Sequence, residues 1–354
     1  MRLMFVYWQL DDAGSAQKIA SYAEAARELG HEVVLYAPET PGFRVPCSLD
    51  IESADAVIFL LEWNIYLHQN RPFPLEEPVR RTPRWKRVVI DDDGMYNDRT
   101  RVDGDYNHPQ AADASSRTEL YDSISDTILQ PTLHPLRPNV ETHLFHGYDP
   151  SWEQPLDFGR KDFGMVYVGS NWFRWRALSR VLGAIEPVRD EIGRMAIAGH
   201  GWDEMPWWVE QPLRDDAYYT DPAYLDRLGI ELMPPVPIDE VVGTMSRGVF
   251  NPVLVRPTFN HFRLVNPRLF ETVAASTIPL FGLDPEYVRE IYGEPALELV
   301  LREDASEQIL DVLRRPGHYA EIVLEMRRHL SERHSFTARV QELVEICERV
   351  AVPG

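Results

Sequence analysis

The feature that most constrains the fold is a repeated succession of short apolar strands and amphipathic helices. Residues 3–8 form an apolar run, residues 17–30 carry apolar side chains at helical spacing, and residues 32–36 form a second apolar run. Two buried strands joined by a helix make a right-handed parallel β-α-β unit. The pattern therefore predicts an open parallel sheet with helices on both faces.

The same pattern continues along the chain and restarts after a segment rich in Pro, Gly and charge at residues 150–161. Further strands are predicted at 56–61, 87–90, 127–130, 142–145, 163–168, 194–198, 248–255, 278–281 and 297–301, and helices at 174–188, 239–245, 267–275, 285–291 and 306–313. The pattern predicts an α/β protein with two Rossmann-like doubly wound domains facing a cleft. We expect these domains to span 1–155 and 156–335. A C-terminal helix, 336–354, opens at Ser335 and is expected to pack back on the first domain.

Composition excludes several classes of function. The 354 residues include 56 acidic and 36 basic side chains, and the formal net charge is −20. Such a charge repels phosphates and anionic lipids, so neither nucleic-acid binding nor membrane insertion is expected. No signal peptide or long apolar run is recognisable, which predicts a cytoplasmic protein. Cys47 and Cys347 are far apart, so neither a disulfide framework nor a structural zinc site is predicted. No cofactor and no bound metal are expected.

Acidic side chains follow two of the predicted strands, at the edge where parallel sheets bind ligands. Asp12 lies in the loop after the first strand, and Asp92 lies in the run Asp91–Asp93 after the strand at 87–90. Each is a candidate general base, although Asp12 also suits a helix cap. Asp91 and Asp93 match the short DxD pattern of metal-dependent sugar transferases, but three acids before a glycine also make an ordinary turn.

Small and basic residues follow two strands of the second half. Gly169, Ser170 and Asn171 form a turn before a helix that carries Arg174 near its start, an arrangement that suits a phosphate. His200 lies between two glycines at the end of the next strand, where it either contacts a ligand or merely completes a turn.

The stretch at residues 263–282 contains a clear set of helix-start signals. Asn266 is an apt N-cap, Pro267 suits the first helical position, and Arg268 and Glu271 then lie one turn apart on one face. An arginine at a capped helix start favours an anion, and a carboxylate one turn deeper can accept hydrogen bonds from vicinal hydroxyls. A nucleoside diphosphate presents these groups in that order. The alternative is an ordinary surface pair worth about 0.5 kcal/mol.

These motifs resemble the two-Rossmann-domain (GT-B) glycosyltransferases, particularly the group similar to spore-maturation glycosyltransferases. The resemblance rests on GSAQKIASYAEAARELGHEV near the start, VYVGSN opening the second half, NPRLFETVAASTIPLF, and the closing HYAEIVLEMRRHLSERHSFTARVQELVEI. It implies that Glu271 binds the ribose of a nucleotide donor and that Arg268 lies near the diphosphate. It also implies that the turn at Gly169 faces the same donor.

The chain departs from that family at Arg263, where many relatives carry a glutamate. A cation about 5 Å from a diphosphate gains roughly 3 kcal/mol per unit charge at an effective dielectric of 20. Arg263 is therefore predicted to steady the departing diphosphate rather than to contact the donor sugar.

The sequence predicts a metal-independent glycosyltransferase that moves a sugar from a nucleoside-diphosphate sugar, with UDP as the expected nucleotide, to an unidentified acceptor in the interdomain cleft. The predicted catalytic residues are Asp12, Asp92 and Arg263; the predicted donor-binding residues are Gly169, Ser170, Asn171, Arg174, His200, Asn266, Arg268 and Glu271. The acceptor is a small molecule, a glycan or a protein. A nucleotide-sugar epimerase of the same fold and a non-catalytic nucleotide-sugar-binding protein are the alternatives.

Overall fold

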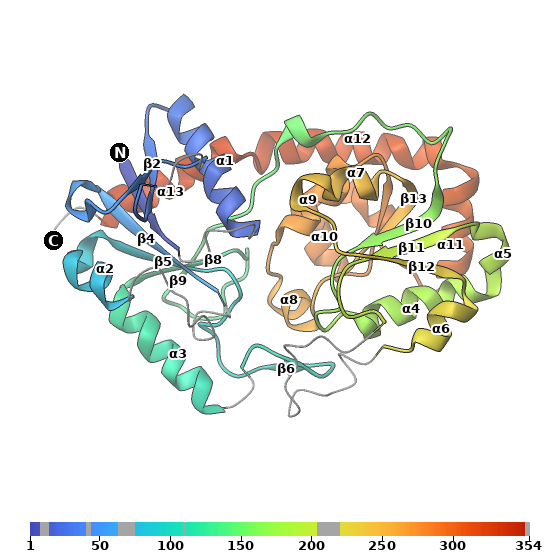
Figure 1. The fold of residues 1–354 in the computed structure, drawn as a ribbon, viewed down its shortest axis with the longest axis horizontal. Helices are drawn as coiled ribbons and strands as arrows, with labels where there is room; N and C mark the ends of the chain where they lie inside the picture. Colours follow the sequence, from blue (N-terminus) through green and yellow to red (C-terminus); the bar gives the residue numbers. More distant parts are fainter. Residues whose placement is uncertain (8–13, 40–43, 63–74, 109–110, 204–219, 351–354) are drawn as a thin grey trace.

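The structure is a computed structural model that describes residues 1–7, 14–39, 44–62, 75–108, 111–203 and 220–350. Two lobes lie side by side, and each is built on a parallel sheet with helices packed against it (Figure 1). The predicted fold class, a pair of Rossmann-like α/β units, is confirmed. Apolar side chains fill the space between sheets and helices in both lobes.

The first sheet has the strand order β3-β2-β1-β4-β5-β8-β9 and is parallel throughout. Its strands are β1 (Arg2–Val6), β2 (Glu32–Tyr36), β3 (Cys47–Ser48), β4 (Ala56–Leu61), β5 (Arg87–Asp91), β8 (Thr127–Gln130) and β9 (Val140–Thr142), and its helices include α1 (Gly14–Glu28), α2 (Glu76–Arg81) and α3 (Ala111–Ile124), with short 3-10 turns η1 (Ile51–Ser53) and η3 (Arg84–Lys86). The strand order reverses beside β1, which has β2 on one side and β4 on the other. Loops at the carboxyl ends of β1 and β4 therefore lie where such sheets bind ligands.

The second sheet has the order β12-β11-β10-β13-β14 and is also parallel. Its strands are β10 (Phe163–Val168), β11 (Met195–Ala198), β12 (Ile230–Met233), β13 (Gly248–Val253) and β14 (Ile278–Phe281). The helices around it are α4 (Trp175–Ile185), α5 (Arg189–Ile192), α6 (Pro222–Arg227), α7 (Val241–Met245), α8 (Pro257–Phe262), α9 (Pro267–Ala274), α10 (Pro285–Tyr292) and α11 (Ala305–Arg314), with η5 (Glu186–Val188), η7 (Ile238–Glu240) and η8 (Glu294–Leu299). The strand order reverses beside β10, so the loop after β10 occupies the corresponding ligand position.

The chain passes between the lobes twice. The first passage contains η4 (Pro150–Trp152), and the second joins α12 (Pro316–Arg333) to α13 (Phe336–Val350). The two passages touch, because the backbone N–H of Tyr148 donates to the carbonyl of His334 at 2.7 Å. Helix α13 packs beside α1, and Phe336, Val340 and Leu343 belong to the core of the first lobe. Ser335 caps α13 by accepting from the backbone of its third residue.

A small antiparallel hairpin, β6 (Arg101–Val102) and β7 (Asp105–Tyr106), extends from the first lobe and contacts α8 of the second (Figure 1). Asp105 is fully buried there. Its carboxylate accepts hydrogen bonds from the Arg256 guanidinium at 2.7 and 3.3 Å and from the Thr258 backbone at 3.0 Å. A buried ion pair thus joins the hairpin to the second lobe.

Most strand predictions are confirmed, but two of them differ from the structure, and the short strands β3, β6, β7 and β12 are not predicted. Residues 297–301 belong mainly to η8 rather than to a strand, since a 3-10 helix begins at Glu294 with Pro295 in its first turn, and only a single bridge joins Val300 to Phe281. Strand β9 ends at Thr142, earlier than predicted. Strand β12 is not predicted, because it is a short edge strand with half its side chains exposed. Within the described ranges, no helix has both the length and the apolar character needed to cross a membrane.

Candidate functional site

The start of α9 has the predicted geometry. The Asn266 side chain accepts a hydrogen bond from the Arg268 backbone N–H at 3.1 Å, and Pro267 follows the cap. The helix buries its apolar residues in the core of the second lobe, and Glu271 is only 7% exposed. Because α9 lies between β13 and the parallel strand β14, this start is at the carboxyl edge of the sheet.

Four cations are linked to this helix start through Arg268, and we call them the cation cluster: Lys18, Arg174, Arg256 and Arg268. Burial lowers the pKa of Arg174, and the positive charges of Arg268 and Arg256 lower this pKa further. Burial also lowers the pKa of Lys18; Glu271 opposes this effect, and Arg268 adds to it. The positive charges are therefore close enough to repel one another. In a protein of net charge −20 such a gathering favours an anionic ligand.

Two carboxylates make ion pairs with this cluster. Asp105 pairs with Arg256, and Glu271 lies 3.6 Å from the Lys18 Nζ and 3.8 Å from an Arg268 nitrogen. Four cations and two anions leave two positive charges, which suits a diphosphate. Arg268 Nη1 is buried and makes no hydrogen bond within the described part of the chain. A donor of this kind is costly to bury unless a ligand completes it.

The turn at residues 169–171 anchors Arg174 and lies against the end of β11. The Arg174 guanidinium donates to the Ser170 carbonyl at 2.9 Å. A Cβ on Gly199 would lie 2.4 Å from the Gly169 carbonyl oxygen, so glycine is required where the two loops meet. Asn171 is fully buried and donates to Gly201 and Thr220 from its side chain, which gives it a structural role in holding the turn.

His200 lies in the loop that follows β11 and is exposed. Its backbone N–H donates to the Ser170 hydroxyl at 3.3 Å, which places the two loops side by side. The structure therefore brings His200 next to the 169–171 turn.

A second group of polar side chains lies at the carboxyl ends of β1, β4 and β5. Asp92 follows β5, and its two carboxylate oxygens lie 3.1 and 3.2 Å from His146 Nε2. Glu62 follows β4 and accepts hydrogen bonds from the Tyr7 hydroxyl at 3.1 Å and from the Ser15 hydroxyl. Asp92 and His146 are 8% and 2% exposed. We call these five residues the acidic site.

Glu62 carries a strongly shifted pKa. Burial, together with the negative charges of Asp93 and Asp92, raises the pKa of Glu62 to about 8. The folded protein therefore holds a proton on Glu62 that the unfolded chain releases above about pH 4.5. Stability conferred by this proton is present at low pH and is lost as the pH rises towards 8.

We expect Glu62→Gln to gain stability relative to the native protein as the pH rises. Glutamine cannot ionise, so its advantage in free energy of unfolding grows by about 2–4 kcal/mol between pH 5 and pH 8.5. Urea unfolding at several pH values measures this difference. Glu24→Gln, at an exposed position of α1, is the control. An advantage for Glu62→Gln that does not change with pH contradicts the raised pKa.

Asp91 has a structural role in the fold. It is fully buried, and its carboxylate accepts hydrogen bonds from the Met95 and Tyr96 backbones, the Tyr121 hydroxyl and the Gln130 side chain. Burial nevertheless raises the pKa of Asp91 to about 6. With both oxygens engaged, Asp91 is not available to bind a metal, and the DxD interpretation loses one of its two ligands.

Of the two remaining predicted catalytic residues, only Arg263 can be placed. Asp12 lies outside the described residues. Arg263 has a left-handed backbone (φ 52°) at the end of α8 and pairs with Glu290 at 3.2 Å and Asp284 at 3.5 Å. His134 of the first lobe also reaches Glu290, at 2.7 Å. The described ion pairs of Arg263 thus neutralise its charge away from the cation cluster.

The sequence prediction does not assign six members of these two groups to a site: Tyr7, Ser15, Lys18, Glu62, His146 and Arg256. Glu62 carries a usable signal, since it is the first residue after a buried strand at the point where strand order reverses. Lys18 and His146 carry no local signal, because one lies within a helix and the other in an irregular segment before the first passage.

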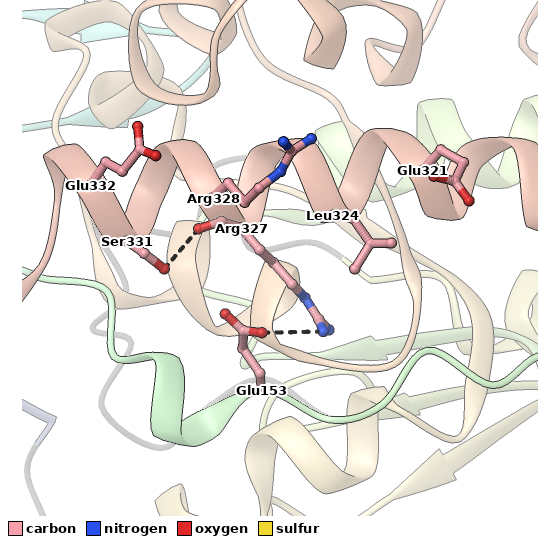
Figure 2. A pocket seen from close by; sticks show the side chains of 7 residues that line it. All are labelled: Glu153, Glu321, Leu324, Arg327, Arg328, Ser331 and Glu332. Atoms are coloured by element: carbon pink, nitrogen blue, oxygen red, sulfur yellow. Dashed lines mark hydrogen bonds and ion pairs between the residues drawn. The ribbon is translucent and has the colours of Figure 1, made fainter.

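A cavity of about 460 Å³ lies elsewhere, beside α12, where Glu153 of the first passage faces the helix (Figure 2). Its lining residues are Glu153, Glu321, Leu324, Arg327, Arg328, Ser331 and Glu332. No predicted site residue lines it. Arg327 nevertheless matters for the site, because its guanidinium donates to the carbonyls of Val273, Ala274 and Gln154. It thereby ties the end of α9 to the first passage between the lobes.

Comparison with solved structures identifies the class of fold. The chain superposes on the DNA-modifying enzyme β-glucosyltransferase with a TM-score of 0.60 at 11% identity, covering 100% of both chains. An α-glucosyltransferase bound to UDP and a DNA 13-mer matches with a TM-score of 0.60 at 12% identity, over 98% of this chain and 99% of the other. AviGT4, a glycosyltransferase involved in avilamycin A biosynthesis, matches with a TM-score of 0.51 at 14% identity, over 99% and 98%. The fold is that of the GT-B glycosyltransferases.

A sequence match covers part of the chain. Residues 176–345 match the family described as glycosyl transferase-like. This match spans just under half of the 354 residues and is similar in kind to the family that the sequence motifs resemble. No curated protein sequence matches the chain. The narrower likeness to spore-maturation enzymes stays a prediction.

Proposed function

We propose that the protein transfers a sugar from a nucleoside-diphosphate sugar to an acceptor hydroxyl between its two lobes. The observation that carries this proposal is the cation cluster around the start of α9, with the buried carboxylate of Glu271 beside it. The cations suit the diphosphate, and Glu271 suits the ribose hydroxyls. UDP is the proposed nucleotide, because a structural neighbour, T4 phage BGT, has been solved in complex with UDP. That neighbour matches with a TM-score of 0.59 at 12% identity, over 98% of this chain and 99% of the other.

In the proposed reaction the acidic site provides the base that activates the acceptor. If configuration inverts, the acceptor oxygen attacks the anomeric carbon and Asp92 takes its proton. The bond from that carbon to the phosphate oxygen breaks, and the nucleoside diphosphate leaves with the electron pair. Arg174 and Arg268 then stabilise the negative charge of the leaving group. His146 holds the Asp92 carboxylate in place through its Nε2.

The domain limits at 155 and 335, a metal-independent reaction and a cytoplasmic location also belong to this proposal. Guanidinium groups take the place of a metal ion beside the diphosphate, although T4 phage BGT has been solved with both UDP and Mn²⁺. The proposed acceptor is not DNA, although the α-glucosyltransferase neighbour is bound to a DNA 13-mer. A net charge of −20 opposes duplex binding.

We expect Glu271→Ala to weaken UDP binding about 10- to 100-fold. The reason is that hydrogen bonds from hydroxyls to a charged carboxylate contribute about 1.5–3 kcal/mol. Isothermal titration calorimetry measures the affinity. Glu286→Ala removes an exposed glutamate on the nearby helix α10 and serves as the matched control. If Glu271→Ala binds UDP as tightly as the control does, the assignment of the donor site to α9 is wrong.

A further inference from the structure

The pairing of Lys18 with Glu271 joins the two lobes at the proposed donor site. Lys18 lies on α1 of the first lobe and Glu271 on α9 of the second, and the residues are 3% and 7% exposed. The Lys18 Nζ is 3.6 Å from a Glu271 oxygen and 4.3 Å from the centre of the Trp152 ring. An ammonium group so deeply buried has lost most of its hydration, which costs several kcal/mol unless strong partners replace the water.

The partners seen for Lys18 are weak replacements for water. Its contact with Glu271 is longer than a hydrogen bond, and the ring of Trp152 offers only a cation–π contact. Arg268 lies on the other side of the same carboxylate, at 3.8 Å. Glu271 therefore faces a cation at each oxygen and receives no side-chain hydrogen bond from the described residues. Such a carboxylate can accept hydroxyl groups without first losing a hydrogen bond.

Lys18 and Arg268 repel each other, so we infer that Lys18 does more than neutralise Glu271. Arg268 already faces that carboxylate, and its charge is one of the causes that lower the pKa of Lys18. A second buried cation at the same place is unfavourable in the empty protein. It becomes favourable when a dianionic group enters between the two cations, because each then gains an opposite charge at short range.

We propose that Lys18 is a donor-binding residue, which the first lobe contributes to the diphosphate of a nucleoside diphosphate bound mainly by the second lobe. This inference rests on the proposed function. Lys18 and Arg268 hold the diphosphate from opposite sides, and Glu271 accepts hydrogen bonds from the ribose hydroxyls. The donor thereby connects α1 and α9, and binding of the diphosphate becomes dependent on both lobes.

The test compares the affinities of UDP and uridine for Lys18→Met, Lys18→Arg and the native protein by calorimetry. Lys18→Met is expected to bind UDP at least tenfold more weakly and to bind uridine as tightly as the native protein or more tightly, because Glu271 is released from its pair. Lys18→Arg keeps the charge and stays within about threefold of the native affinity for UDP. Lys86→Met, at a lysine on the same lobe whose ammonium donates to the Ala54 carbonyl, is the control.

The outcomes separate this inference from the proposed function. Unchanged or tighter UDP binding by Lys18→Met, together with weakened binding by Glu271→Ala, overturns the role of Lys18 and leaves the donor site on α9 in place. Absence of UDP binding by the native protein overturns the proposed function itself. Equal weakening of UDP and uridine in Lys18→Met indicates a structural role and also overturns the inference. If Lys18→Met fails to fold, the ratio of UDP to uridine affinity in Lys18→Ala decides the question by the same criteria.

Discussion

Asp92→Asn is expected to lower the turnover number about 10²- to 10⁴-fold while leaving the affinity for UDP unchanged. Asparagine keeps the size of the side chain and can still contact His146, but it cannot take a proton from the acceptor hydroxyl. Asp92 makes no ion pair with the cation cluster among the described residues, so we expect the loss to fall on the chemical step rather than on UDP binding. Release of UDP in the presence of an acceptor, followed by a coupled assay, measures turnover.

The prediction for Asp92→Asn is contradicted if the variant keeps its turnover number. Turnover of Asp92→Asn within about threefold of the native rate excludes Asp92 as the base. It favours a reaction that retains configuration, for which no such base is needed. Asp93→Asn changes the neighbouring acid, and a loss confined to Asp92→Asn separates a specific role from a general change in the charge of the acidic site.

Asp105→Asn is expected to lower the free energy of unfolding by about 3–5 kcal/mol. The substitution removes the negative charge that Arg256 faces in a fully buried environment, and an unpaired buried charge is strongly unfavourable. Chemical unfolding in urea, followed by fluorescence and circular dichroism, measures the loss. The two signals should be compared, because a protein with two lobes need not unfold in a single step.

The same hairpin provides a matched control for Asp105. Asp103 pairs with Arg180 at 3.5 Å, but these side chains are 46% and 74% exposed, and exposed pairs contribute about 0–1 kcal/mol. Asparagine also tolerates the left-handed backbone of Asp103 (φ 48°). Asp103→Asn is therefore expected to change stability by less than about 0.5 kcal/mol. Equal effects of the two substitutions argue that the hairpin does not close on α8 in solution.

The elements that the sequence predicts well are those whose cause is local. Strand β4 and helix α9 follow from an uninterrupted apolar run and from a cap with a proline, and the structure has both within one residue of the predicted bounds. The prediction misses strand β12 because its conformation depends on its place at the sheet edge rather than on its own composition. The strand predicted at residues 297–301 is absent because the second sheet ends at β14.

The candidate site divides in the same way. Arg268 and Glu271 are recognisable because a helix start fixes their relation within four residues. Lys18 is paired with a residue more than 250 positions away, and no periodicity indicates such a contact. The role predicted for Arg263 stays a prediction: its charge suits a diphosphate, and in the structure it pairs with Glu290 and Asp284. Charge alone predicts an affinity for anions and leaves open which anion is within reach.

Helix α13 has a consequence for the order in which the protein folds during synthesis. Phe336 fills the space over Gly147, where an added Cβ would lie 2.9 Å from its ring, and Val340 and Leu343 complete the core of the first lobe. The ribosome makes the rest of that lobe before any of these residues exists. The lobe synthesised first therefore keeps an unfilled apolar surface until α13 emerges, while the second lobe already has its own strands and helices. Nascent chains that end before residue 336 should accordingly show a folded second lobe beside an incompletely packed first one.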